Sequence, residues 1–155
     1  MSDYDYKVEK EPFPVKLYLS NGTMQEGIIF RGLHAAFHEG PEMVKDVLWQ
    51  TEQFIPVHFT EGATRLIHKD QISAIAFQSD DLDMDPSDMN TSSVHEVTVQ
   101  LVNNIRLEGN FLFLLPSHAR RVKDFLNQRE PFLELRKGKQ VYLINKAHVL
   151  FVEEK

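Results

Sequence analysis

Hydrophobic and polar positions alternate in two segments of the chain. Val15, Leu17 and Leu19 alternate with more polar residues, and the alternation recurs from Val97 to Leu101. A period of two over such a length predicts a β-strand that buries one face. Each half of the sequence is therefore expected to open with a half-buried strand.

A turn and a second strand follow each of these segments. Asn21-Gly22 is the favoured pair for a tight hairpin because both positions tolerate positive φ, and Asn103-Asn104 occupies the same place in the second half. The strand after each turn carries a glycine, Gly27 or Gly109, in its interior. A glycine inside a strand often marks a bulge or a sharp bend, so two bent hairpins are predicted.

A change to helical spacing comes next in both halves. Apolar residues recur at this spacing in two stripes: Met43, Val44, Val47 and Leu48, then Ala119, Val122, Phe125 and Leu126. Pro41 suits the first turn of the first helix, and Ser117 suits the N-cap of the second. Strands then begin at Phe54 and at Phe132, and a final hairpin ends each half. The predicted order is β-β-α-β-β-β, twice.

These elements form an internal repeat with three matched blocks. The matched residues are, in chain order, Glu26-Gly27 and Glu108-Gly109, Val44-Lys45-Asp46 and Val122-Lys123-Asp124, and Leu66-Ile67 and Leu143-Ile144. Self-similarity in a fixed order indicates tandem copies of one unit. The predicted organisation is a polar tail over 1–14, a first repeat over 15–77, an acidic flexible linker over 78–96 and a second repeat over 97–155.

Each copy has roughly 60 residues, a size at which a single core is marginal. We therefore expect the two copies to pack on one another, or each on a partner, and a pseudo-twofold arrangement is the simplest way to cover both apolar faces. The expected fold is mainly β with short helices.

Two family resemblances refine this expectation. The second copy carries Asp124-Phe125-Leu126-Asn127 and then Leu143-Ile144-Asn145-Lys146-Ala147-His148-Val149. In these residues the chain resembles a family of small bacterial β domains of unknown function, here in tandem. The first copy departs from this pattern, with Trp49 and His68 in place of Asn. The resemblance implies a fold and a bacterial origin.

The second, looser resemblance is carried by Leu19-Ser20-Asn21-Gly22, by Glu26-Gly27, and by Leu66-Ile67 followed by Ile72. These residues resemble Sm-like and other SH3-like small barrels, a group that includes binders of single-stranded RNA. The resemblance implies two tandem small barrels. The RNA-binding loops of that group have no full counterpart, because the inserted helix occupies the first and no glycine follows Lys69 or Lys146.

Composition narrows the function. The formal net charge is -6, and the chain has no cysteine. A bulk acidic balance disfavours general binding to phosphate backbones, and the lack of cysteine excludes disulfides, thiolate zinc sites and cysteine nucleophiles. The N-terminal sequence has no apolar signal segment, and no apolar run approaches a membrane span. A cytoplasmic location is therefore expected.

Positive side chains nevertheless cluster locally. Arg120, Arg121 and Lys123 lie on the second predicted helix, and Lys69 and Lys146 recur at the same place in both copies. These residues are candidates for an anion or nucleic-acid site, with a solvated helix face or hairpin surface as the alternative.

Other candidates concern metals and protein partners. His34 and His38 are four residues apart, but a zinc site needs further ligands and only Glu39 is near, so they are weak metal candidates. Trp49 is expected to be buried, with an exposed partner-binding anchor as the alternative. Phe54 and Phe132 are further partner-binding candidates.

No phosphate-binding loop or nucleophile elbow occurs, and the carboxylate pairs lie in the tail and linker. The sequence therefore predicts a non-enzymatic interaction or scaffold module without a cofactor, which binds a protein partner or self-associates. Nucleic-acid or nucleotide binding through the second-repeat basic cluster is the alternative.

Overall fold

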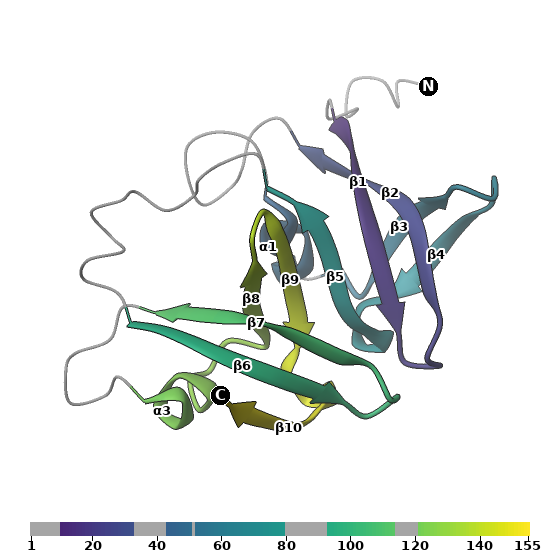
Figure 1. The fold of residues 1–155 in the computed structure, drawn as a ribbon. Helices are drawn as coiled ribbons and strands as arrows, with labels where there is room; N and C mark the ends of the chain where they lie inside the picture. Colours follow the sequence, from purple (N-terminus) through teal and green to yellow (C-terminus); the bar gives the residue numbers. More distant parts are fainter. Residues whose placement is uncertain (1–9, 33–42, 51, 80–92, 114–120) are drawn as a thin grey trace, which may run out of the picture.

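The computed structural model describes residues 10–32, 43–50, 52–79, 93–113 and 121–155, and in them ten strands form one antiparallel sheet (Figure 1). The elements in chain order are β1 (Lys10–Leu19), β2 (Met24–Gly32), α1 (Val44–Trp49), β3 (Phe54–Phe59), β4 (Thr64–His68), β5 (Ile72–Gln78), β6 (Ser93–Leu101), β7 (Arg106–Phe113), α3 (Val122–Leu126), β8 (Phe132–Lys137), β9 (Gln140–Asn145) and β10 (Val149–Glu154). Short 3-10 turns at Lys69–Gln71 and Lys146–His148 precede β5 and β10. The mainly β class and the predicted order of elements are confirmed.

Strand registers in the two halves correspond. Val15 pairs with Gly27 as Val97 pairs with Gly109. The pairing of β5 with β1 skips Ser73, and the pairing of β10 with β6 skips its counterpart. Because the backbone registers agree strand by strand, the paired residues of β1 to β5 have structural counterparts in β6 to β10.

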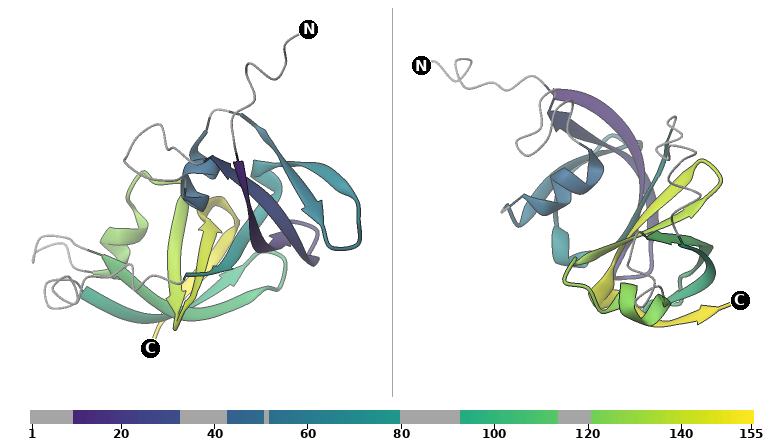
Figure 2. Two further views of the ribbon diagram at one scale, coloured as in Figure 1. Left: turned by 90° about the horizontal axis from the view of Figure 1, so that it is seen from above. Right: turned by 90° about the vertical axis from the view of Figure 1, so that its left-hand side faces the viewer.

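The expected pair of closed barrels is not what the structure shows. The ten strands form a single open sheet in the order β10-β6-β7-β8-β9-β5-β1-β2-β3-β4. Strand direction turns from near vertical in β1, β5 and β9 to near horizontal in β6 and β7 in Figure 1, so the sheet is strongly twisted, as Figure 2 also shows.

The expected pseudo-twofold arrangement is also corrected. A twofold axis would pair a strand with its own counterpart, or it would pair β4 with β10 in the same way as β9 pairs with β5. In the structure β9 pairs with β5, whereas their counterparts β4 and β10 form the two ends of the sheet. The halves are thus joined head to tail. We call the β9–β5 pairing the joint, and β4 and β10 the open edges.

Strands extend beyond the predicted boundaries. β1 begins at Lys10, inside the predicted tail, and β6 begins at Ser93, inside the predicted linker. The part of β1 inside the predicted tail contains Pro12 and Pro14. Both residues are tolerated because this part of β1 pairs with β2 alone, which leaves one side without ladder hydrogen bonds.

Two apolar clusters form the core, one in each half. Val15, Leu17 and Ile29 pack with α1 in the first cluster, and Val97 and Phe111 lie in the second. The clusters exchange residues across the joint: Leu143 of β9 belongs to the first cluster, and Ala74 of β5 belongs to the second.

The two strand glycines permit close approach of neighbouring strands. A Cβ on Gly109 would lie 2.6 Å from the Arg136 carbonyl oxygen, and a Cβ on Gly27 would lie 2.8 Å from a methyl carbon of Val57. These glycines therefore let β7 approach β8, and β2 approach β3, where the sheet bends.

Candidate interaction surfaces at the open sheet edges

The joint shows how an edge of this sheet is used when it has a partner. β5 and β9 align antiparallel, with Ile75 opposite Leu143 and Ala74 opposite Ile144. All four side chains are buried. The β5–β9 edges are thus covered by both backbone pairing and apolar packing.

Polar side chains complete the joint beside β5. Asn103 Nδ2, from the β6–β7 turn, donates to the Leu19 carbonyl oxygen at 2.7 Å and to Ser73 Oγ at 3.0 Å. His148 Nδ1 lies 2.7 Å from Ser73 Oγ, and its Nε2 lies 2.8 Å from the Asp70 carbonyl oxygen. Because a carbonyl only accepts, Nε2 carries a proton, and in the neutral ring Nδ1 accepts from Ser73.

This serine–histidine contact resembles a nucleophile and its base only in composition. Ser73 is fully buried, and its hydroxyl also accepts from Asn103. A nucleophile needs space beside it for a reacting atom. The network therefore serves to fix the two halves in register.

Two tyrosines flank β5 at the joint. The rings of Tyr18 in β1 and Tyr142 in β9 lie 6.4 Å apart, next to the small residues Ala74 and Ala76. Burial raises the pKa of Tyr18, and the neighbouring Tyr142 adds to this rise. Burial also raises the pKa of Tyr142. Both phenols are thus held in the neutral form.

The β4 edge presents the same kind of surface, and no strand among the described residues pairs with it. Leu66, the counterpart of Leu143, is 69% exposed, whereas Leu143 is 4% exposed. Phe54, the counterpart of Phe132, is 50% exposed. Phe132 is half-buried against the core of the first half. The two phenylalanines singled out from the sequence thus occupy equivalent positions, one covered at the joint and one open.

The β10 edge is the complementary open surface. Leu150 and Phe151 are 63% and 41% exposed, although their counterparts Ser73 and Ala74 in β5 are fully buried. Strands at sheet ends normally avoid exposed apolar side chains because such edges pair with other chains. The exposed apolar residues of β4 and β10 are therefore features that call for an explanation.

Lys69 and Lys146, the repeated lysines, make the same contacts in both halves. Lys69 Nζ donates to the Gln50 carbonyl oxygen at 2.6 Å, and Lys146 Nζ donates to the Gln128 carbonyl oxygen. Each ammonium thus holds the segment after the helix to the turn before the last strand. Burial lowers the pKa of Lys69, and Glu52 opposes this shift.

The predicted basic cluster is only partly described. Arg120 lies outside the described residues. Arg121 and Lys123 are exposed on α3, and Arg121 Nε lies 3.0 Å from Asp124 Oδ2. A carboxylate thus balances the arginine locally.

The remaining candidates are placed as follows. Trp49 is 49% exposed at the end of α1, so the expectation of burial is wrong and the alternative of an exposed side chain holds. His34 and His38 lie outside the described residues. Among the described residues, no three His, Asp or Glu side chains are grouped as a metal site would require.

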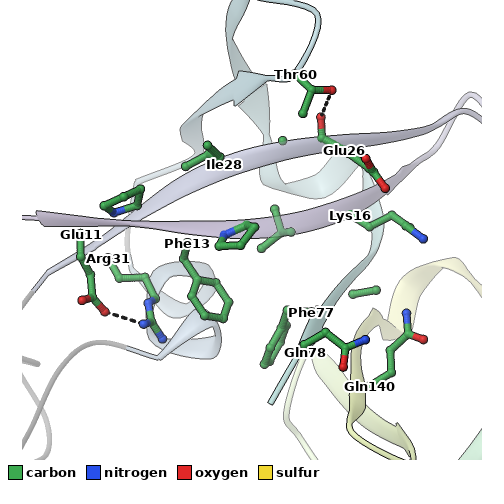
Figure 3. Close-up of a pocket in the computed structure, with 15 residues that line it drawn as sticks. Glu11, Phe13, Lys16, Glu26, Ile28, Arg31, Thr60, Phe77, Gln78 and Gln140 are labelled. Carbon is green, nitrogen blue, oxygen red and sulfur yellow. Dashed lines mark hydrogen bonds and ion pairs between the residues drawn. The ribbon is translucent and has the colours of Figure 1, made fainter. Parts of the chain in front are cut away.

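An open groove runs along β1 and β2 (Figure 3). The Arg31 guanidinium lies 3.8 Å from the centre of the Phe13 ring and forms an ion pair with Glu11 at 2.5 Å. Phe13 also packs edge-to-face on Phe77, 5.5 Å between ring centres. The described residues that line the groove include Lys16, Glu26 and Thr60.

Several edge residues were not identified from the sequence. Leu66, Leu150 and Phe151 read as ordinary strand positions, and only strand order shows that β4 and β10 end the sheet. An alignment of the two halves could have found them, because Leu66, Leu150 and Phe151 align with residues of β9 or β5, the two strands of the joint.

No helix in the described part of the chain is long and apolar enough to cross a membrane. In comparisons with known proteins, no family model, curated protein or solved structure matches this chain significantly.

Proposed function

We propose that this chain is a non-enzymatic interaction module, built from two duplicated small β units, that accepts a further protein strand at its open sheet edges. One observation carries the proposal: Leu66 is exposed at the β4 edge while its counterpart Leu143 is buried at the joint. At the joint, a corresponding strand edge pairs with another strand and buries its leucine, and we propose that the open edge makes the same kind of contact with a partner.

Backbone chemistry favours such a contact. An end strand carries N–H and C=O groups that no neighbouring strand uses, and an added strand supplies their partners together with pockets for alternate side chains. Beside the backbone of this edge, Leu66 of β4 and Phe54 of the neighbouring strand β3 are exposed, and the Phe54 ring lies 4.8 Å from the His68 ring. A strand added at this edge would therefore form backbone hydrogen bonds and cover exposed apolar side chains at the same place.

The alternative, nucleic-acid binding, has less support. Lys69 and Lys146 each donate a hydrogen bond to a carbonyl oxygen of the protein itself, and Arg121 is paired with Asp124. Affinity for a phosphate backbone comes mostly from cations free to replace counterions. On the resemblance to small bacterial β domains, we also propose a bacterial origin for the chain.

A capture experiment tests the function. The unaltered chain, Leu66→Asp and the double variant Arg121→Glu/Lys123→Glu are used as baits in extracts, and bound protein and RNA are both measured. Protein that is lost with Leu66→Asp and retained with the double variant supports strand addition. RNA that is lost only with the double variant, and steeply with salt, contradicts it.

A further inference from the structure

The joint is a heterologous contact, since it uses one edge of the first half and the opposite edge of the second. A contact of this kind leaves one edge of each type unused, here β4 and β10. Such contacts repeat between molecules and produce rings or filaments. The two open edges also lie apart in Figures 1 and 2. They do not pair with one another within one chain.

We infer that the partner at these edges is a second copy of this chain, whose β10 pairs with β4 of the first copy in the register of the joint. This inference rests on the proposed function and names its partner. Since β4 corresponds to β9 and β10 corresponds to β5, pairing of β4 with β10 of another molecule repeats a contact that the molecule already makes at the joint.

The register can be written out from the joint. Ile75 opposite Leu143 becomes Val152 opposite Leu66, so apolar residues meet. Ala76 opposite Tyr142 becomes Glu153 opposite Arg65, which is a pair of opposite charges. Cross-strand pairs of both kinds stabilise an antiparallel ladder.

The contact between copies differs from the joint in its polar part. Leu150 stands in place of Ser73, and Arg65 in place of Tyr142, so the serine network and the tyrosine pair are replaced by apolar and charged groups. Arg65 and Glu153 are both about half-exposed and at present bind Glu61 and Arg106. Association is thus expected to depend on protein concentration and to weaken with salt.

Cysteine cross-linking tests both the partner and the register, because the natural chain has no cysteine. Arg65→Cys and Glu153→Cys chains are mixed in a glutathione redox buffer and separated on a non-reducing gel. A mixed disulfide dimer is expected, since directly opposed residues fall within disulfide reach. In the matched control, Thr64→Cys replaces Arg65→Cys. The side chain at position 64 points to the other face of the strand, so this variant should give much less cross-linking.

Charge reversal provides the second measurement, made by sedimentation over a range of concentrations. Arg65→Glu or Glu153→Arg alone should weaken association about tenfold or more, because like charges then face one another. The double variant should restore it. Circular dichroism shows whether each variant is folded.

A chain that stays monomeric at every concentration and gives no mixed disulfide overturns the inference. Equal cross-linking by the Thr64→Cys control, or loss of association without rescue by the double variant, overturns the register. The proposed function fails separately: it falls if capture depends on Arg121 and Lys123, whatever the oligomeric state.

Discussion

The joint and the open edges are built from corresponding strands, yet their side chains have opposite environments. β5 and β9 bury Ile75, Ile144 and Leu143, whereas β4 and β10 expose Leu66 and Phe151. Apolar character is retained at both places. What differs is whether a neighbouring strand is present, so the open edges have the composition of contacts that are made with another molecule.

The largest expected effect is a difference in the free energy of unfolding between a leucine substitution at the joint and the corresponding substitution at the β4 edge. Leu143→Ala should lower the free energy of unfolding by about 2–5 kcal/mol because it leaves a cavity in a buried site. Leu66→Ala should change it by less than about 0.5 kcal/mol in dilute protein, since this side chain is exposed. Urea unfolding followed by circular dichroism measures both. Equal losses would show that the β4 edge is already covered in the isolated chain.

A smaller effect should come from the turn amides. Asn103→Ala removes hydrogen bonds to Leu19 and Ser73 and should cost about 1–3 kcal/mol, because partly buried partners lose their donor. Asn21, its counterpart, accepts from the backbone N–H and the hydroxyl of the exposed Thr23, so Asn21→Ala should cost less than about 1 kcal/mol. Unfolding midpoints of the two variants give the comparison, and a larger loss at Asn21 would contradict it.

Alkaline pH should loosen the joint. The pKa values of Tyr18 and Tyr142 are raised in the folded state, so their contribution is intact below pH 10.0 and is lost as pH rises through the folded pKa values. Stability measured between neutral and strongly alkaline pH should therefore fall less in Tyr18→Phe/Tyr142→Phe than in the natural chain. The same fall in both proteins would exclude the joint tyrosines as its cause.

The smallest effect is expected at the edge charges. Arg65 contacts Glu61 with both side chains about half-exposed, and its guanidinium lies 5.0 Å from the centre of the Phe59 ring; contacts of these kinds at exposed sites contribute about 0–1 kcal/mol. Arg65→Ala should therefore lower the free energy of unfolding of dilute protein by about 1 kcal/mol or less while it weakens association at high concentration. A larger loss in dilute protein, with association unchanged, would mean that Arg65 acts only within one chain.

Part of the interaction surface was accessible from the sequence. Phe54 and Phe132 were singled out at matched positions, and the structure places Phe54 exposed on β3, next to the open β4 edge, and Phe132 half-buried on β8 against the core of the first half. Lys69 and Lys146 were recognised as recurring, but their bonds to backbone carbonyls depend on where the helix ends. Trp49 was expected to be buried because it follows the apolar stripe of the first helix. The expectation failed because apolar spacing does not show where a short helix leaves the core.

The sequence by itself determined the strands, the turns and the correspondence of the two halves, because burial of one face imposes a period that side chains display. Only the tertiary structure decided that β9 pairs with β5 and that β4 and β10 stay open. The physical reason is that strands pair through backbone N–H and C=O groups, which are the same in every strand. Side-chain pattern specifies a strand's faces, and packing of the whole chain selects its neighbours.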